Sequence, residues 1–460
     1  MPVQNALILA AGKGTRMKSA VVKVLHSVAG RPMLGWPLST VREAGATAIV
    51  IVAGHQAEQV REQYGAEFDV RIALQEEQLG TGHAVACAMP ALQEQNGALL
   101  IVCGDTPLLT GATLQRLAAS HTESGAAITV LTARMENPQG YGRIVRSGDG
   151  QVLRIVEQKD ASPSEQGIDE INSGIYCMDL TFLRANISRL GSGNAQNEYY
   201  LTDLVELAVA GQKGCNALMV SDALEIMGVN DRVQLAEASA ALRARINHQL
   251  MLQGVTLIDP ARTCIDADVV VGSDTVIWPG CVLQGQTVIG QGALLESNVQ
   301  VSSCRIGDRA HLKNGSVLDG SVIGCDVAVG PMAHLRPGTV LGDQVKIGNF
   351  VETKKAVLGD GSKASHLTYL GDAEIGRDVN IGCGTITCNY DGVKKHRTVI
   401  GDGVFVGSDV QLVAPVTVGN GALIAAGTTV TKDVPPDSLA IARTPQVNKE
   451  GWCLKKRTND

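Results

Sequence analysis

Aromatic residues, closely spaced cysteines and charge of one sign are all scarce in this chain of 460 residues. Phe, Trp and Tyr together make up 3% of it. Its eleven cysteines are scattered and no C-x-x-C occurs, which argues against a disulfide framework or a zinc site and favours a reducing, cytoplasmic compartment. The net charge of -7 gives no general attraction to nucleic acid or to an anionic membrane, so local charges must hold any anionic ligand.

Long apolar runs are also lacking. The amino-terminal run from Ala6 to Ala11 has only six residues and no basic flank, which suits a buried strand and not a signal peptide. The stretch from Val410 to Thr431 is uncharged and long enough to cross a bilayer, but Pro415, Gly419 and several polar residues interrupt it. We therefore expect no membrane segment.

The chain changes its sequence pattern at about residue 230. Before that point, strand-like runs such as "ALILAAG", "AIVIVAG", "ALLIVCGD" and "AAITVLTA" alternate with helical segments such as "GATLQRLAASH". This pattern predicts a Rossmann-like α/β domain with a mostly parallel sheet over residues 1–230. Residues 231–253 contain no internal Gly or Pro and place Leu235, Leu242, Ile246 and Leu250 near one face, which predicts a helical linker.

Residues 254–460 follow a six-residue repeat. An aliphatic residue followed by glycine recurs six positions apart, as at Ile323 and Val329, and longer intervals are multiples of six: Ile323 to Leu341 and Ile400 to Val418 are both eighteen. Three hexads to a coil predict a triangular parallel β-helix with one aliphatic side chain per face pointing inward and glycine at the corner. A narrow prism filled by Val, Ile, Leu and Ala also explains why aromatic residues are so few.

A glycine-rich stretch, "LAAGKGTRM", follows the first predicted strand. It is not a dinucleotide fingerprint, because Met17 stands at the third glycine position, and it lacks the spacing of a P-loop. The stretch therefore predicts a turn whose backbone N–H groups approach an anion, with Lys13, Arg16 and Lys23 as charged donors. A plain turn after a strand remains the alternative.

The motifs "LAAGKGTRMKS", "QEEQLGTGHA", "CGDTPLL", "GYGRIV", "VEQKDA", "EINSGIY", "NEYYLTDL" and "GVNDRVQL" resemble, in order, those of the sugar-nucleotide pyrophosphorylases. With the hexads added, nearly the whole chain resembles the family of bacterial bifunctional N-acetylglucosamine-1-phosphate uridyltransferases and glucosamine-1-phosphate N-acetyltransferases. The resemblance implies synthesis of UDP-N-acetylglucosamine, a precursor for peptidoglycan and lipopolysaccharide. It also implies a left-handed β-helix, a cytoplasmic homotrimer and acetyltransferase sites built from more than one chain.

Attack of a sugar phosphate on UTP needs positive charge around the phosphates and a divalent cation, Mg²⁺ by its preference for oxygen ligands. Lys13, Arg16 and Lys23 supply charge, and Asp105 follows a strand; by resemblance Asn230 completes the metal site. The resemblance implies Arg16 and Lys23 as catalytic residues. It also implies the following binding residues for UTP and N-acetylglucosamine 1-phosphate: Leu9, Ala10, Ala11, Gly12, Lys23, Gln75, Gly80, Thr81, Gly140, Glu157, Asn172 and Asn230. Of these, Gln75, Gly80 and Thr81 are assigned to the uracil side, and Gly140, Glu157 and Asn172 to the sugar side.

A second site is predicted where loops interrupt the hexads, in "HLRPG", in "NFVETKKA" with "GSKASHLTYLGD", and in "GTITCNYDGVKKHR". Acetyl transfer from acetyl-CoA to an amine needs a base, and His366 is the candidate because histidine titrates near neutrality. The family motifs match Arg336, Lys354, Tyr369, Asn380 and Lys395 for glucosamine 1-phosphate. They match Cys383, Asn389, Tyr390, Ser408, Ala426 and Arg443 for acetyl-CoA.

Two positions depart from the family pattern. Val22 stands where the family usually has proline before Lys23, and Cys383 stands where alanine is expected. Two other functions also remain open. In one, the β-helix only mediates oligomerisation or regulation; in the other, the chain is a non-enzymatic nucleotide-exchange subunit of a translation factor. The interrupting loops argue against the first and Lys13, Arg16, Lys23, Asp105 and Asn230 against the second.

Overall fold

The computed structural model describes residues 3–54, 56–67 and 69–457, and the last three residues of the predicted domain 254–460 lie outside them. The chain divides into two compact units, Met1–Leu242 and Arg243–Asp460. The division falls inside helix α8 (Arg232–Leu252), whereas the prediction assigned residues 231–253 as a whole to a linker. Within the described residues, no helix combines the length and the apolar content needed to span a bilayer.

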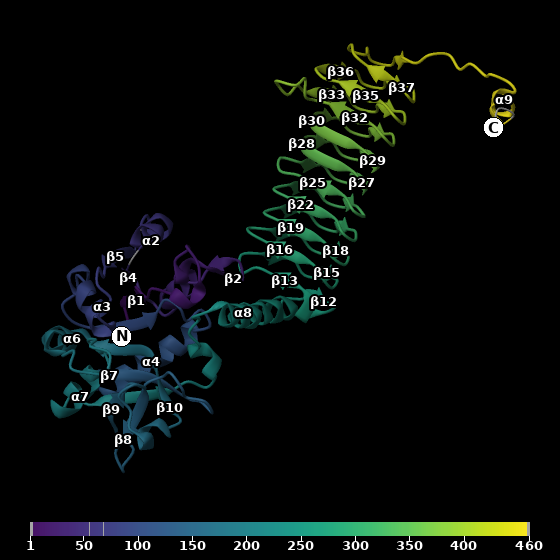
Figure 1. Ribbon diagram of the computed structural model, residues 1–460. Helices are drawn as coiled ribbons and strands as arrows, with labels where there is room; N and C mark the ends of the chain where they lie inside the picture. Colours follow the sequence, from purple (N-terminus) through teal and green to yellow (C-terminus); the bar gives the residue numbers. More distant parts are fainter. Residues whose placement is uncertain (1–2, 55, 68, 458–460) are drawn as a thin grey trace. The chain divides into compact units, whose positions relative to one another are not determined.

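The first unit is a mixed, mostly parallel sheet with helices on its faces (Figure 1). Its strands are β1 (Asn5–Ala10), β4 (Ala48–Ala53), β5 (Val70–Leu74), β6 (Ala98–Cys103), β7 (Ile128–Arg134), β8 (Arg143–Arg146), β9 (Val152–Val156), β10 (Glu170–Asp179) and β11 (Cys215–Met219), with β2 (Ser27–Val28) and β3 (Arg31–Pro32) as a separate pair. Its helices are α1 (Gly35–Glu43), α2 (Ala57–Tyr64), α3 (Thr81–Ala88), α4 (Gly111–Ser124), α5 (Pro163–Gln166), α6 (Leu180–Asn186) and α7 (Asp203–Ala210).

The strand order β11-β7-β10-β6-β1-β4-β5 brings β1 between β6 and β4, with parallel pairing on both sides. Only β10 runs antiparallel to its two neighbours on this path through the described sheet. The carboxyl ends of β1 and β6 therefore lie side by side, which is where ligands bind in such sheets. The predicted α/β class and its four quoted strands are confirmed.

The second unit is a parallel β-helix of short strands (Figure 1). One sheet contains β12 (Thr256–Leu257), β15 (Val276–Ile277), β18 (Leu294–Leu295), β21 (His311–Leu312), β24 (Ala328–Val329), β27 (Lys346–Asn349), β29 (Lys363–His366), β31 (Asn380–Ile381), β34 (Phe405–Val406), β37 (Leu423–Ile424) and β39 (Leu439–Ala440).

The other two faces share one continuous sheet, because β28 (Glu352–Leu358) and β30 (Tyr369–Ile375) bend round a corner and pair on both faces. Its remaining strands are β13 (Cys264–Ile265), β14 (Val270–Val271), β16 (Val282–Gln284), β17 (Val288–Ile289), β19 (Gln300–Ser302), β20 (Arg305–Ile306), β22 (Val317–Asp319), β23 (Val322–Ile323), β25 (His334–Leu335), β26 (Val340–Leu341), β32 (Ile386–Cys388), β33 (Thr398–Ile400), β35 (Gln411–Val413), β36 (Val416–Val418) and β38 (Thr429–Val430). A short helix, α9 (Trp452–Arg457), follows residues 441–451.

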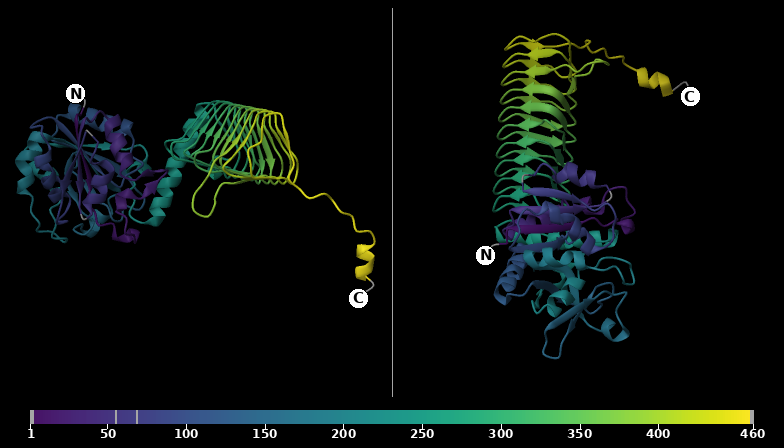
Figure 2. Two further views of the ribbon diagram at one scale, coloured as in Figure 1. Left: turned by 90° about the horizontal axis from the view of Figure 1, so that it is seen from above. Right: turned by 90° about the vertical axis from the view of Figure 1, so that its left-hand side faces the viewer.

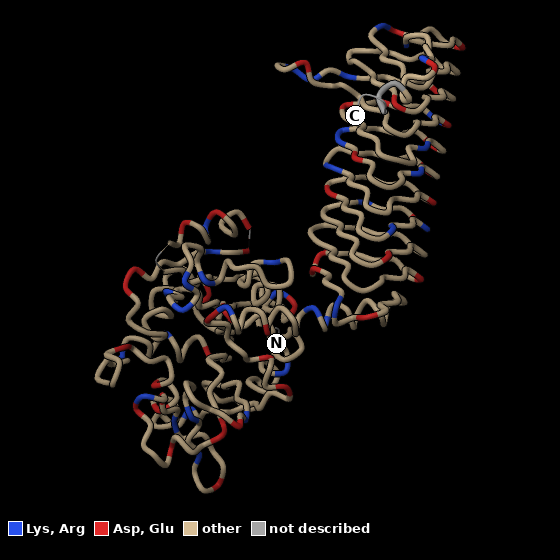
Figure 3. Tube along the Cα trace, turned by 45° about the vertical axis from the view of Figure 1, so that its right-hand side comes forward, with Lys and Arg blue, Asp and Glu red and all other residues tan. Residues whose placement is uncertain are grey.

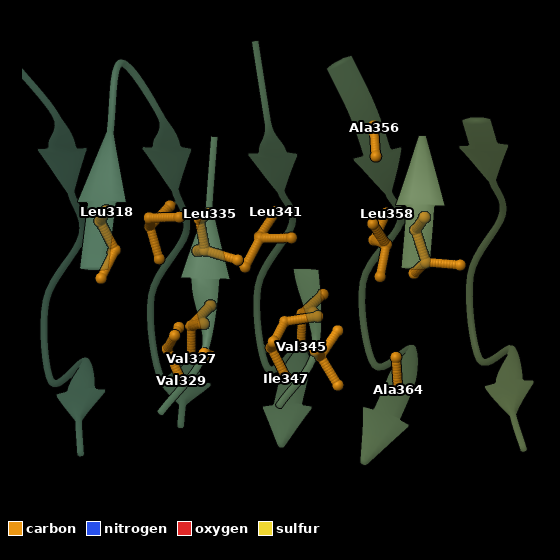
Figure 4. Packing of buried hydrophobic residues seen from close by; sticks show 14 of the residues in the cluster. Leu318, Val327, Val329, Leu335, Leu341, Val345, Ile347, Ala356, Leu358 and Ala364 are labelled. Carbon is orange, nitrogen blue, oxygen red and sulfur yellow. The ribbon is translucent and has the colours of Figure 1, made fainter. Parts of the chain in front are cut away.

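The register of the strands confirms the predicted repeat. Ile323 pairs with Leu341 and Ile400 with Val418, the two intervals of eighteen residues seen in the sequence. Aliphatic side chains of successive coils point into one continuous core, as Figure 4 shows for ten labelled residues between Leu318 and Ala364. Each inward side chain stacks on its counterpart in the next coil, so the narrow core needs no aromatic residue.

The repeated glycines have a different role from the one predicted. A Cβ atom on Gly342 would lie 2.3 Å from Asp360 Oδ1, so the glycine allows the next coil to approach closely. Asp360 Oδ1 then accepts a hydrogen bond from Asp343 N at 2.9 Å, and Asp343 Oδ1 accepts one from Cys325 N at 2.7 Å. The left-handed backbone that turns the corner lies two residues later, at Asp326 and Gln344.

The carboxyl half of α8 closes the first coil of the β-helix. Leu250 belongs to the β-helix core and Ile246 packs against it. Asn247 is 2% exposed, and its Nδ2 donates to the carbonyl oxygens of Pro260 at 2.8 Å and Thr263 at 3.0 Å. Of the predicted apolar face, Ile246 and Leu250 therefore serve the β-helix itself.

Candidate functional sites

The first candidate site lies at the carboxyl ends of β1 and β6. Gly104 N donates to Leu9 O at 2.8 Å, which places Asp105 beside the turn that follows β1. A Cβ atom on Gly104 would lie 3.1 Å from that of Ala10, so a glycine here lets the two strand ends come together. The sheet thus unites two motifs that are about ninety residues apart in the sequence.

The glycine-rich stretch forms a tight turn leading into a 3-10 helix, η1 (Thr15–Met17). Gly14 is left-handed at φ +60°, and a Cβ atom there would lie 2.6 Å from Lys23 Cβ. Met17, which stands at the third glycine position of a dinucleotide fingerprint, is instead buried in the domain at 1% exposure. Lys13 and Arg16 are exposed on the outer side of this turn.

Lys23 connects the two oxygen ligands predicted for the metal. Its Nζ lies 2.5 Å from Asp105 Oδ2 and 3.1 Å from Asn230 Oδ1. Asn230 reaches this point because Val229 N donates to Asp105 O at 2.8 Å. Its own backbone N–H donates to Gln234 Oε1 on α8 at 2.8 Å. Asp105 and Asn230, from distant parts of the sequence, thus meet at the ammonium group of Lys23.

A pocket of about 280 Å³ opens beside this cluster. The predicted residues that line it are Leu9, Ala10, Ala11, Gly12, Lys23, Gln75, Gly80, Thr81 and Asp105. The other lining residues, which were not predicted, are Val24, Gln78, Ala84, Cys103 and Glu198, and all of them except Val24 lie inside motifs quoted for the resemblance. The lining joins residues from β1, β6, the segment before α3 and the "NEYYLTDL" segment into one binding surface.

The residues predicted for the uracil side are held rigidly. Gln75 is 3% exposed, and its Nε2 donates to Gly80 O at 3.1 Å. Gly80 adopts φ +107° at the start of α3, a conformation that side chains disfavour. Thr81 Oγ1 accepts a hydrogen bond from Leu201 N at 3.1 Å, which ties α3 to the "NEYYLTDL" segment.

Two of the three residues predicted for the sugar side, Glu157 and Asn172, lie close together. Neither is among the described residues that line the 280 Å³ pocket. A Cβ atom on Gly142 would lie 3.5 Å from both Asn172 Cβ and Glu157 Oε2. Asn172 Nδ2 donates to the hydroxyl of Tyr176 at 2.8 Å. Glu157 Oε1 accepts from Thr202 Oγ1 at 3.2 Å, and burial raises the pKa of this carboxyl group. Gly140 is exposed, and its N–H donates to Gln158 Oε1 at 3.2 Å.

Val22 does not distort the loop before Lys23. Its backbone has φ -55°, which lies in the range that a proline ring imposes, and ψ 135°, an extended value that proline also adopts. Its N–H makes only a long contact to Gln59 Oε1, at 3.4 Å. The departure from the family pattern therefore changes the stiffness of the unfolded chain more than the shape of the folded loop.

The second candidate site lies at one corner of the β-helix. His366 ends β29, and Tyr369 begins β30 after a two-residue turn. The imidazole is exposed, and its Nδ1 lies 3.0 Å from Asn349 Oδ1 on the preceding coil. Asn349 was not predicted as a site residue, although it begins the stretch "NFVETKKA" that interrupts the hexads, because only the stacking of coils places it beside His366.

Three of the residues predicted for glucosamine 1-phosphate, Arg336, Lys354 and Lys395, form a cluster of positive charge that could hold its phosphate. The pKa of Lys354 is lowered by the ammonium group of Lys395 and, to a smaller extent, by Arg336. Arg336 NH1 contacts Glu352 Oε1 at 2.7 Å, and Glu352 is paired with Tyr369 in the sheet. Figure 3 shows the charges along the coils. Cations that repel one another gain stability from a phosphate placed between them.

The loop between β32 and β33 projects from the stack of coils (Figure 2). It carries Tyr390 and Lys395, which form an isolated antiparallel bridge across the loop. Asp391 stabilises the turn: its carboxylate accepts from the backbone N–H groups of Lys394 and Val393 and contacts His396 Nε2 at 2.7 Å. These contacts hold the pKa of Asp391 well below its usual range. At the base of the loop, Asn389 Nδ2 donates to Asp372 Oδ2 at 2.6 Å.

The residues predicted for acetyl-CoA fall into two groups. Asp409 N donates to Cys383 O at 2.7 Å and Gly427 N to Ser408 O at 2.8 Å, so Cys383, Ser408 and Ala426 lie on successive coils along the corner of His366. Arg443 joins them, because its NH1 donates to Ala426 O at 2.6 Å. Asn389 and Tyr390 lie apart, on the projecting loop. Asn380, predicted for the sugar, lies on β31 between Lys363 and Phe405.

Comparison with known proteins assigns a class to each unit. Residues 6–162 match the family model of the MobA-like NTP transferase domain, residues 265–359 that of the GMPPB C-terminal domain, and residues 397–432 that of the bacterial transferase hexapeptide. The fold and these matches define a nucleotidyltransferase joined to a hexapeptide-repeat acyltransferase.

Three relatives match over nearly their whole length. The bifunctional protein GlmU of Trichlorobacter lovleyi is 74% identical over 459 residues, covering 100% of both chains. Those of Pelobacter propionicus and Geobacillus thermodenitrificans are 68% and 52% identical and cover 98% and 99% of this chain and 99% of their own. The chain belongs to the GlmU family of bifunctional proteins. The predicted family and its two transferase functions are thereby confirmed.

Proposed function

We propose that this chain acetylates glucosamine 1-phosphate with acetyl-CoA at the β-helix and then transfers a uridylyl group from UTP to the product in the amino-terminal unit. The observation that carries the proposal is the presence of two separate constellations, each suited to one transfer. Lys23, Asp105 and Asn230 meet beside a pocket in the first unit. The second unit holds the imidazole of His366, in contact with Asn349, and a cluster of cations around Lys354. The proposed donors, UTP and acetyl-CoA, imply a cytoplasmic location.

Uridylyl transfer depends on positioning and charge. A phosphate oxygen of the sugar attacks the α-phosphorus of UTP, the bond to the leaving pyrophosphate breaks, and negative charge spreads over the phosphate oxygens. Lys13 and Arg16 lie exposed on the turn and can reach these oxygens from one side. The backbone of Gly12 has open space above it, because a Cβ atom there would meet nothing within 4 Å. Phosphates can therefore approach this turn closely.

Asp105 and Asn230 fit a magnesium ion. Their oxygens already converge on one cation, the Lys23 ammonium group, at 2.5 Å and 3.1 Å. One carboxylate oxygen and one amide oxygen make a ligand set that suits an ion which keeps waters and phosphates as its other ligands. When bound, the ion neutralises charge on the triphosphate. Lys23 is then free to donate to a phosphate oxygen.

Acetyl transfer needs a base close to a phosphate-binding group. His366 takes a proton as the amine of glucosamine 1-phosphate attacks the thioester carbonyl, and the bond to the coenzyme sulfur then breaks. Arg336, Lys354 and Lys395 hold the sugar phosphate, which fixes the distance between amine and imidazole. Cys383 lies on the coil after His366 and is partly exposed, so it borders the path of the thioester.

We propose a homotrimer because two apolar surfaces of the β-helix are exposed. Val322, Val340 and Val357 are paired in register along one face and are 47%, 38% and 40% exposed. At the corner of His366, the bulky residues Met332, Phe350 and Leu367 have left-handed φ values of 53°, 57° and 42°, and each is more than half exposed. Strained apolar side chains facing water next to a site favour a second chain that covers them.

A fragment from Arg243 to the end tests the trimer. It should fold, sediment as a trimer and acetylate by itself, because each coil needs only its neighbours. A fragment from Gly254 lacks the cap formed by Ile246, Asn247 and Leu250, and its Tm should be lower by roughly 5 °C or more. Sedimentation and thermal melting of both fragments check this. A monomer with full acetyltransferase activity would contradict a site shared between chains.

The function itself is tested by two separate assays of the full chain. Incubation with UTP, Mg²⁺ and N-acetylglucosamine 1-phosphate should release pyrophosphate, and incubation with acetyl-CoA and glucosamine 1-phosphate should release free thiol. Release of pyrophosphate without free thiol would show that the β-helix is only a scaffold or regulatory module. If neither pyrophosphate nor thiol were released, the result would favour a binding subunit without catalysis.

A further inference from the structure

Asn349 is the side chain that contacts the imidazole of His366. Its Oδ1 lies 3.0 Å from His366 Nδ1, and the two residues are directly paired in the register of β27 and β29. An amide oxygen only accepts hydrogen bonds, so this contact is a hydrogen bond in the tautomer that carries its proton on Nδ1. In the neutral ring this leaves the lone pair on Nε2, the nitrogen that does not contact Asn349.

The backbone keeps these two residues in place. A Cβ atom on Gly348 would lie 1.8 Å from Ser365 O, so glycine allows the two strands to approach at this point. Leu367 N donates to Asn349 O at 3.1 Å, which fixes the following turn to the same residue. Asn349 thus holds the segment of His366 through both its side chain and its main chain.

Neighbouring coils offer no substitute for this acceptor. When the register of β29 and β31 is continued by two residues, Cys383 occupies the position of His366 on the next coil. The titratable side chains on the strands and turns packed against this corner are Lys346, Glu352, Lys363, Tyr369, Cys383 and Asp409. Among the described residues, none of these has a hydrogen bond or ion pair to His366, whereas Asn349 has one.

We propose that Asn349 is a positioning residue for acetyl transfer, which orients the His366 ring and keeps its proton on Nδ1 so that Nε2 receives the proton of the attacking amine. This inference rests on the proposed role of His366 as the base. Asn349 itself touches no reacting atom. Its loss therefore lowers kcat and leaves KM for both substrates nearly unchanged, because binding groups are retained.

The test compares three variants of the full chain in the acetyl-transfer assay across pH. Asn349→Leu removes the acceptor at similar size and should lower kcat roughly ten- to a hundredfold. Asn349→Asp keeps an acceptor and adds a negative charge, which favours the protonated ring. Its activity should recover at high pH, and its pH limb should move up by about one unit. Asn314→Leu is the matched control, since Asn314 occupies the same corner position two coils earlier and should have no effect.

The outcomes separate the inference from the function on which it rests. An Asn349→Leu variant within about twofold of wild type, with an unmoved pH limb, overturns the positioning role if His366→Ala is inactive in the same assay. An active His366→Ala variant overturns the proposed base instead. If Asn349→Leu fails to fold, Asn349→Asp carries the test alone, because an unmoved limb in that variant also contradicts the inference. Uridylyl transfer should be normal throughout.

Discussion

Asp105→Ala should abolish pyrophosphate release, lowering uridylyl transfer by at least roughly a hundredfold, while acetyl transfer stays close to wild type. Two consequences of the substitution add together. The carboxylate ligand for the metal is lost. Lys23 also loses the partner that lies 2.5 Å from its Nζ, so the carboxylate no longer holds the ammonium group beside the metal site. Both assays on one preparation measure the selectivity directly.

Asp105→Asn is the sharper companion variant, because it keeps the shape of the side chain and removes only its charge. It should need a higher Mg²⁺ concentration for half-maximal rate, since a neutral oxygen binds the ion more weakly. Asp149→Ala, a carboxylate in an exposed turn, is the control for loss of one negative charge. Unchanged uridylyl transfer in Asp105→Ala would remove this residue from the mechanism.

His366→Ala should lower acetyl transfer by roughly two to four orders of magnitude, the range expected for a positioned general base, and leave uridylyl transfer intact. The wild-type rate should rise with pH as the imidazole loses its proton, and this limb should vanish in the variant. The imidazole is exposed, so its removal costs little packing and a selective loss of one activity cannot come from unfolding.

His311→Ala provides the control for this second prediction. His311 lies on β21, three strands away from β29 in the same sheet of the β-helix, and its Nε2 contacts Glu296 Oε1 at 2.7 Å. Its replacement should leave both activities unchanged. A His366→Ala variant that acetylates within a few-fold of wild type and keeps the same pH limb would show that another group takes the proton.

Much of the architecture could be predicted because it depends on local patterns. The hexads from Ile323 to Val418 repeat with a period that only a three-sided coil satisfies, and their pairing follows from counting alone. The strands before Gly12 and Asp105 are buried runs bounded by glycine, so their carboxyl ends could be located as the place for a ligand.

The role of the repeated glycines could not be predicted in the same way. A glycine after an aliphatic residue indicates a corner, but the sequence does not show which backbone group needs the space. The structure shows that Gly342 admits the carboxylate of Asp360 from the following coil, while Gln344 takes the left-handed conformation. The distinction depends on contacts between coils and not on the hexad itself.

The two fold classes, their order along the chain and the residue types available for each transfer follow from local patterns, since periodicity and strand boundaries are local properties. Which of those residues meet depends on the packing of segments that are distant in the chain. Lys23 between Asp105 and Asn230, and Asn349 beside His366, are neighbours because strand order and coil stacking bring distant segments together. A hydrogen bond of about 3 Å depends on that packing, and no spacing in one sequence encodes it.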